Sequence, residues 1–103
     1  MKTAKVTKTS TGLKNQPPYH VILIDDQEHT HQYVVEMMGV LFGFSEVKSE
    51  QIAHEVHDKG KCILITTTRE YAEFKQEQIQ GYGPDKNIIK CKGSMRCDIE
   101  PAR

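Results

Sequence analysis

The sequence has no net charge and no long apolar run, and these two absences exclude several classes of partner. Lys plus Arg and Asp plus Glu both number 14 among 103 residues, so no overall field attracts nucleic acid or an anionic membrane surface. No apolar stretch approaches the roughly 20 residues that a transmembrane helix needs. We therefore expect neither nucleic acid nor a membrane as a partner.

The sequence also lacks the cysteines of a disulfide framework. Cys62, Cys91 and Cys97 cannot all pair, and none belongs to a C-x-x-C motif. The first 16 residues contain four lysines but no apolar segment, so they do not resemble a secretory signal. Both observations favour a reducing cytoplasm, where these cysteines are small core residues.

The chain is expected to form one domain behind a short tail. Residues 1–16 hold few apolar side chains and cannot offset the entropy of ordering, so we expect a disordered basic tail. Pro17 and Pro18 close it, because consecutive prolines disfavour helix. The remaining length allows one modest core, so residues 17–103 are predicted to form a single domain.

Hydrophobic periodicity predicts the element order β-α-α-β-α-β. Residues 19–25 and 62–66 are expected to be strands, the first with apolar residues on both faces, as if both faces were covered. Alternation over residues 89–99 predicts a third, half-buried strand, which Gly93 and Ser94 can interrupt. The predicted fold is α+β, a three-stranded sheet packed against three helices.

Three helices are predicted between these strands from caps and apolar spacing. Thr30, Ser45 and Thr68 are expected N-caps, and Gly43 and Gly60 are expected to end the first two helices. The side chains expected to face the core are Val34, Met37, Met38 and Leu41, then Val47, Ile52, Ala53 and Val56, and finally Tyr71, Phe74, Ile79 and Tyr82.

The most polar cluster follows the first strand. Asp25 and Asp26 can simply form a turn, because Asp side chains bond nearby backbone N–H groups. Together with the histidines they can also suggest a zinc or iron site, although the H-x-x-H spacing of His54 and His57 lacks the usual third ligand. The remaining histidines are His20, His29 and His31.

No catalytic motif competes with this cluster. The sequence has no G-x-S-x-G, no P-loop and no glycine-rich dinucleotide turn. Cys62 lies in a predicted buried strand with only Lys61 nearby to activate it. We expect no catalytic residue and no cofactor. A metal-binding or hydrolytic protein that uses Asp25, Asp26 and the histidines stays the alternative.

Four segments, taken in order, resemble the ClpS family of protease adaptors: PPYHVILIDDQEHTHQYVVEMMGVLFG, IAHEVHDKGK, TTTREYAEFK and CDIEP. The resemblance covers about residues 17–101. ClpS proteins bind a free N-terminal Leu, Phe, Tyr or Trp, called an N-degron, and deliver that protein to a ClpA or ClpC unfoldase for degradation. The resemblance implies a monomeric, non-enzymatic adaptor with a three-stranded sheet and three helices. A generic interaction domain, like the C-terminal domain of the ribosomal stalk protein, is a third interpretation.

The resemblance also implies residue roles. A buried ammonium group needs converging acceptors, since an unpaired buried cation is very costly. By resemblance Asp25, Asp26 and His57 contact the substrate's α-amino group, and Glu70 and Lys75 bind the unfoldase, although alone they look like an ordinary solvated helix surface. The implied side-chain pocket consists of Leu23, His29, His31, Val34, Ala53, Val56 and Met95.

Four positions depart from the family pattern. Asp25 stands where the family has Asn, so a group that accepts and donates is replaced by one that only accepts when ionised. Gln27 replaces a second family Asp. His31 replaces the Met that gates the pocket, and Ala53 replaces another pocket Met. We expect a wider, more polar pocket that favours Tyr and Trp over Leu.

Overall fold

The computed structural model describes residues 16–26, 28–86, 88, 91 and 93–102. The predicted disordered tail therefore lies outside the described residues except for Gln16, and so does Gln27. Within the described residues, no helix has both the length and the apolar character required to cross a membrane.

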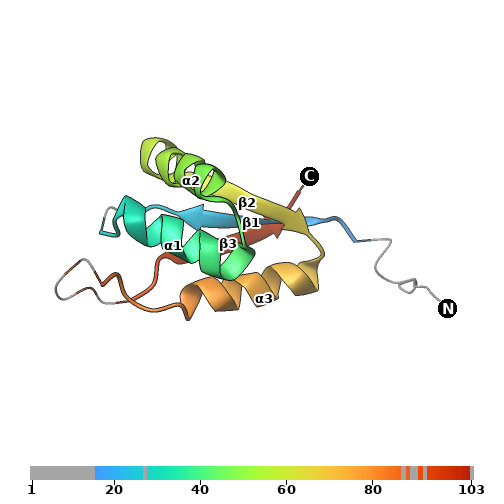
Figure 1. Ribbon diagram of the computed structural model, residues 1–103. Coiled ribbons are helices and arrows are strands. Elements are labelled where there is room, and N and C mark those ends of the chain that lie inside the picture. The colour runs from blue at the N-terminus through green and yellow to red at the C-terminus, as the bar shows by residue number, and fades with distance from the viewer. Residues whose placement is uncertain (1–15, 27, 87, 89–90, 92, 103) are drawn as a thin grey trace.

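The predicted order of elements is confirmed. A three-stranded antiparallel sheet has the order β2-β1-β3, so the first strand lies in the centre. Figure 1 shows the helices packed along this sheet, with the start of the first strand and the end of the last strand at the same end of the sheet. The elements are β1 (Tyr19–Ile24), α1 (His31–Phe42), α2 (Glu46–Lys59), β2 (Lys61–Thr67), α3 (Arg69–Gln80) and β3 (Arg96–Pro101).

One hydrophobic cluster joins the helices to a single face of the sheet. Val21 and Leu23 of β1 are both 0% exposed and belong to a cluster with buried side chains from all three helices. Ile22 points to the other face and lies outside that cluster, although it is 4% exposed. The expectation that apolar residues are covered on both faces of this strand therefore holds for Val21, Ile22 and Leu23, although the helices pack on one face.

The predicted caps are confirmed, and they explain where each helix begins. The side chains of Thr30, Ser45 and Thr68 each accept a hydrogen bond from the backbone N–H three residues further on. Gly43 and Gly60 end the first two helices with φ values of 70° and 86°, a conformation that glycine adopts without a Cβ clash.

Three side chains that were expected to face the core are exposed. Val47 is 70% exposed, Tyr71 45% and Phe74 50%. The buried stripe of α2 begins at Ser49, and a residue two positions away lies on nearly the opposite side of a helix. In α3 the buried stripe is Ala72, Lys75 and Ile79, which leaves the two aromatic rings on its flanks.

The last strand begins at Arg96, so the prediction of strand from residue 89 is wrong for the described residues before it. Hydrogen bonds that involve a side chain hold this segment instead of pairing with a neighbouring strand. The carbonyl oxygen of Gly93 accepts from His29, and the hydroxyl of Ser94 bonds both the N–H and the carbonyl oxygen of Gly83. The alternating pattern there reflects a loop that packs against the core, where Met95 is 1% exposed.

Candidate functional site

The end of β1 lies beside the end of α2. The backbone N–H of Asp25 donates to the carbonyl oxygen of Gly60 at 2.9 Å. Gly60 caps α2, and His57 lies in the last turn of that helix. Asp25 is half-buried and His57 is exposed. Both were predicted to bind an α-amino group, and both lie at the same end of the sheet, where β1 ends and β2 begins.

Three imidazole rings meet at this end of the sheet, and we call them the histidine group: His31, His54 and His57. The ring of His31 lies edge-on to that of His54, with centroids 4.8 Å apart, and edge-on to that of His57 at 5.6 Å. The first comes from the first residue of α1, and the others from α2. The structure thus brings together the predicted gate residue and the predicted ammonium acceptor.

The apolar residues of the predicted pocket are all core residues. They share one hydrophobic cluster, so their side chains are covered rather than open to solvent in this structure. His31 is only half-buried. The five exposed fractions are 0% for Leu23, 4% for Val34, 1% for Ala53, 2% for Val56 and 1% for Met95.

Asp26 and His29 form an ion pair that fixes the acidic turn. The carboxylate of Asp26 accepts from the backbone N–H of Glu28 at 3.0 Å and from Nδ1 of His29 at 2.8 Å. The other ring nitrogen, Nε2, donates to the carbonyl oxygen of Gly93 at 2.6 Å. Because both neighbours are acceptors, an imidazolium with two N–H donors satisfies both of them. The turn interpretation of Asp26 thus has support, and His29 links that turn to the loop before β3.

The ion pair shifts the protonation of both partners. Burial opposes the charged imidazolium, but the hydrogen bonds to Asp26 and to the carbonyl oxygen of Gly93 outweigh it and raise the pKa of His29. Burial likewise acts to raise the pKa of Asp26, but the hydrogen bonds from His29 and from the N–H of Glu28 dominate, and the net pKa is lowered. Both shifts favour the charged pair.

Asp85 supports the site and was not predicted from the sequence. It is 2% exposed, and its Oδ2 accepts from the backbone N–H of Thr30 at 2.8 Å and from the Thr30 hydroxyl at 2.9 Å. The hydroxyl of Tyr33 donates to the carbonyl oxygen of Gly83 at 2.6 Å. The start of α1, and with it His31, is held by the loop after α3. The residues around Asp85 read only as a turn in the sequence.

The two predicted unfoldase-binding residues differ in exposure. Glu70 is exposed in the first turn of α3, whereas Lys75 is 6% exposed. The Lys75 ammonium donates to the carbonyl oxygen of Leu41 and to Oε1 of Gln78. It also lies 4.7 Å from the ring centroid of Phe42. The interpretation of Lys75 as solvated helix surface is therefore wrong, and this side chain joins α3 to the end of α1.

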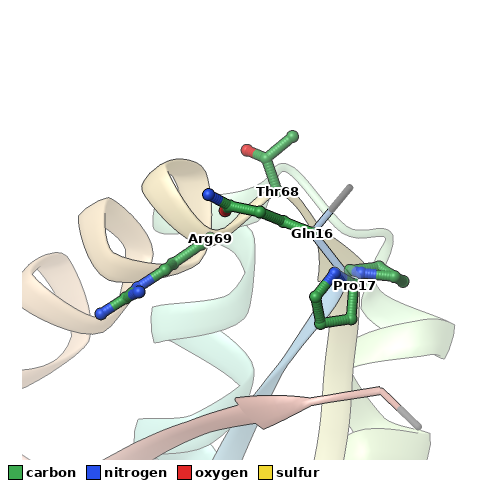
Figure 2. A pocket seen from close by; sticks show the side chains of 5 residues that line it. Gln16, Pro17, Thr68 and Arg69 are labelled. Atoms are coloured by element: carbon green, nitrogen blue, oxygen red, sulfur yellow. The ribbon is translucent and has the colours of Figure 1, made fainter. Parts of the chain in front are cut away.

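Three hollows in the described surface lie away from the histidine group. Figure 2 shows one of about 200 Å³, where Gln16 and Pro17, ahead of β1, face Thr68 and Arg69 at the start of α3. A second, of about 330 Å³, lies between α2 and β2, and a third of the same volume lies beside Tyr33. None includes Asp25 or His57.

Two of the cysteines are poor candidates for nucleophilic catalysis. Burial raises the pKa of Cys62 to about 11 and that of Cys97 to about 12, so both are protonated near neutral pH.

Two clusters of described residues could hold a metal ion, and neither includes Asp25 or Asp26. They are Glu28 with His29 and Cys91, and His31 with Glu50 and His54.

Comparison with known proteins identifies the class as a protease adaptor. The family model described as "ATP-dependent Clp protease adaptor protein ClpS" matches residues 14–89. The chain belongs to the ClpS family. A Vibrio cholerae protein named "ATP-dependent Clp protease adapter protein ClpS" is 33% identical over 95 residues, which are 92% of this chain and 85% of the relative. A Hydrogenovibrio crunogenus protein of the same name is 30% identical over 89 residues, 84% of this chain and 81% of the relative.

A solved structure has the same fold. It is described as "The structure of Agrobacterium tumefaciens ClpS2 bound to L-phenylalaninamide". Its TM-score is 0.73 at 20% sequence identity, and the match covers 84% of this chain and 99% of that one. At this identity the likeness concerns the fold alone.

A first prediction concerns the pH dependence of stability. The pKa of His29 is raised, so its contribution is complete below the unfolded value of about 6.5 and is lost as pH rises through the folded pKa. The lowered pKa of Asp26 gives a contribution that is lost as pH falls below about 4. We expect the melting temperature of His29→Asn to lie furthest below wild type near pH 5–6 and to approach it above pH 8. His20→Asn is the matched control, and a His29→Asn deficit that grows toward pH 8 would contradict the ion pair.

A second prediction separates stability from docking at α3. Lys75→Ala removes a charge-assisted hydrogen bond to the carbonyl oxygen of Leu41, so the free energy of unfolding should fall by about 1.5–3 kcal/mol. Glu70→Gln loses only a favourable charge near a helix N-terminus, about 0.3–1 kcal/mol. Urea denaturation of both variants measures this difference. An unchanged midpoint for Lys75→Ala would refute the structural role.

Proposed function

We propose that this adaptor binds the free N-terminal residue of other proteins and delivers them to a Clp unfoldase of the ClpA or ClpC type. One observation carries the proposal, the hydrogen bond from Asp25 to Gly60 that places the end of β1 beside the helix end bearing His57. A carboxylate and an imidazole at one end of the sheet, next to an apolar core, suit a ligand that is cationic at its start and apolar in its first side chain.

The chemistry of an α-ammonium fits these acceptors. The group has three N–H donors and a positive charge, so leaving the charge unpaired during burial would be very costly. The carboxylate of Asp25 supplies charge-assisted acceptance, and a neutral ring of His57 supplies a second acceptor. Asp26 adds negative charge beside them, although two backbone N–H groups and His29 already engage its carboxylate.

The ligand of the Agrobacterium tumefaciens protein supports this class of substrate. L-phenylalaninamide is an aromatic amino acid with a free α-amino group and no terminal carboxylate, as in the first residue of a chain. An aromatic first residue has to enter where core residues are now covered, so binding must move the half-buried His31 or the side chains beneath it. Ala53, where the family has Met, is a smaller side chain, and we expect it to ease this movement.

We propose that the N-terminal half of α3 is the surface that docks on the unfoldase. Glu70 is exposed there, beside the exposed rings of Tyr71 and Phe74. Lys75 supports these rings, because its ammonium lies 5.6 Å and 5.8 Å from their centroids. The cytoplasmic location and the monomeric state stay predictions.

A third prediction uses a panel of peptides that differ only in their first residue. Each peptide is tested free and N-acetylated by fluorescence anisotropy. Acetylation removes the positive charge and most of the donors, so affinity for a Tyr-initiated peptide should fall by at least tenfold. A generic docking surface would bind both forms equally, which would overturn the proposal.

The same panel tests the pocket. Because His31 and Ala53 stand where the family has methionines, free peptides that begin with Tyr or Trp should bind more tightly than the Leu peptide. His31→Met should shift the preference back toward Leu, with His20→Asn as the control. Tightest binding of Leu by the unaltered chain would refute this part of the proposal.

A further inference from the structure

The histidine group has an acidic neighbour that the adaptor function does not use. Glu50 and His54 lie one turn apart on α2, so their side chains share a face of the helix. His31, at the first residue of α1, faces them from the adjacent helix. One ligand atom from each of the three side chains can be chosen so that all lie within 4.8 Å of one another.

We propose that His31, Glu50 and His54 bind a divalent transition-metal ion of the zinc class. Two imidazoles and a carboxylate form a common ligand set for such ions, which bind nitrogen and oxygen at about 2.0–2.2 Å. Two ligands of one tetrahedral ion lie roughly 3.5 Å apart, so the side chains must approach by roughly 1 Å. Glu50 and His54 are exposed and His31 is half-buried, so their rotamers can adjust.

These three side chains are available to a metal. Across residues 16–102 as far as the structure describes them, none of the three makes a side-chain hydrogen bond or an ion pair, so binding breaks no existing polar contact. The other cluster, Glu28 with His29 and Cys91, differs in this respect. Both ring nitrogens of His29 are already engaged, by Asp26 and by Gly93, and a metal would have to displace a partner.

A metal ion here would oppose binding of an N-terminal ammonium. The ring of His57 lies 5.6 Å from that of His31, so the ion would place positive charge close to the proposed ammonium acceptor. Coordination would also hold His31 against α2 and keep it from moving. This consequence rests on the proposed function, whereas the metal site itself does not.

The metal site is tested by zinc titration of the full chain without a histidine tag. Competition with a chromophoric chelator gives the affinity of the wild type, His54→Asn and Glu50→Gln. We expect at least a tenfold weaker affinity in both variants. Wild-type affinity is expected in the matched controls, His20→Asn at the sheet and Glu46→Gln at the start of α2. Equal zinc affinity in wild type and His54→Asn, or no binding by wild type, would overturn the site.

The antagonism is tested by measuring the affinity of a free Tyr-initiated peptide with and without saturating zinc. We expect zinc to weaken peptide binding about tenfold in the wild type and to leave it unchanged in His54→Asn. Zinc binding without any effect on the peptide would overturn the antagonism and leave the site standing. A peptide that fails to bind even without zinc would instead contradict the proposed function.

Discussion

The position of the candidate site depends on one backbone hydrogen bond, from the N–H of Asp25 to the carbonyl oxygen of Gly60. It joins the end of the central strand to the end of α2, and the left-handed conformation of Gly60 directs the chain from that helix into β2. Asp25 and His57 are 32 residues apart in the sequence, and this bond brings their elements together at one end of the sheet.

Around this bond, polar contacts hold the segments that carry the site. Asp85 anchors the start of α1 through Thr30, which orients the first residue of that helix, His31. The imidazolium of His29 connects the acidic turn to the loop before β3. The buried groups among them, the His29 ring and Asp85, are costly unless hydrogen-bonded or paired, and the pairing with His29 commits Asp26 mainly to structure.

The sequence predicted the elements and their caps because those signals are local. Thr30, Ser45 and Thr68 act on N–H groups three residues away, and the glycines act on their own backbone. Prediction from the sequence failed where a contact with a residue distant in the chain determines whether a side chain is buried or a segment joins the sheet. Lys75 is buried because Leu41 supplies a carbonyl oxygen, and Gly93 and Ser94 lie outside the strand, where they hydrogen-bond to His29 and Gly83. The pairing of His31 with His54 depends on how α1 crosses α2, which no spacing reveals.

The central claim is that Asp25 and His57 act together on the α-ammonium of a substrate. A double-mutant cycle measures this directly, with the dissociation constant of a free Tyr-initiated peptide for wild type, Asp25→Ala, His57→Ala and the double variant. We predict at least a tenfold loss for each single variant and a combined loss smaller than the product of the two. Single losses below twofold, or losses of the same size for the acetylated peptide, would contradict the account.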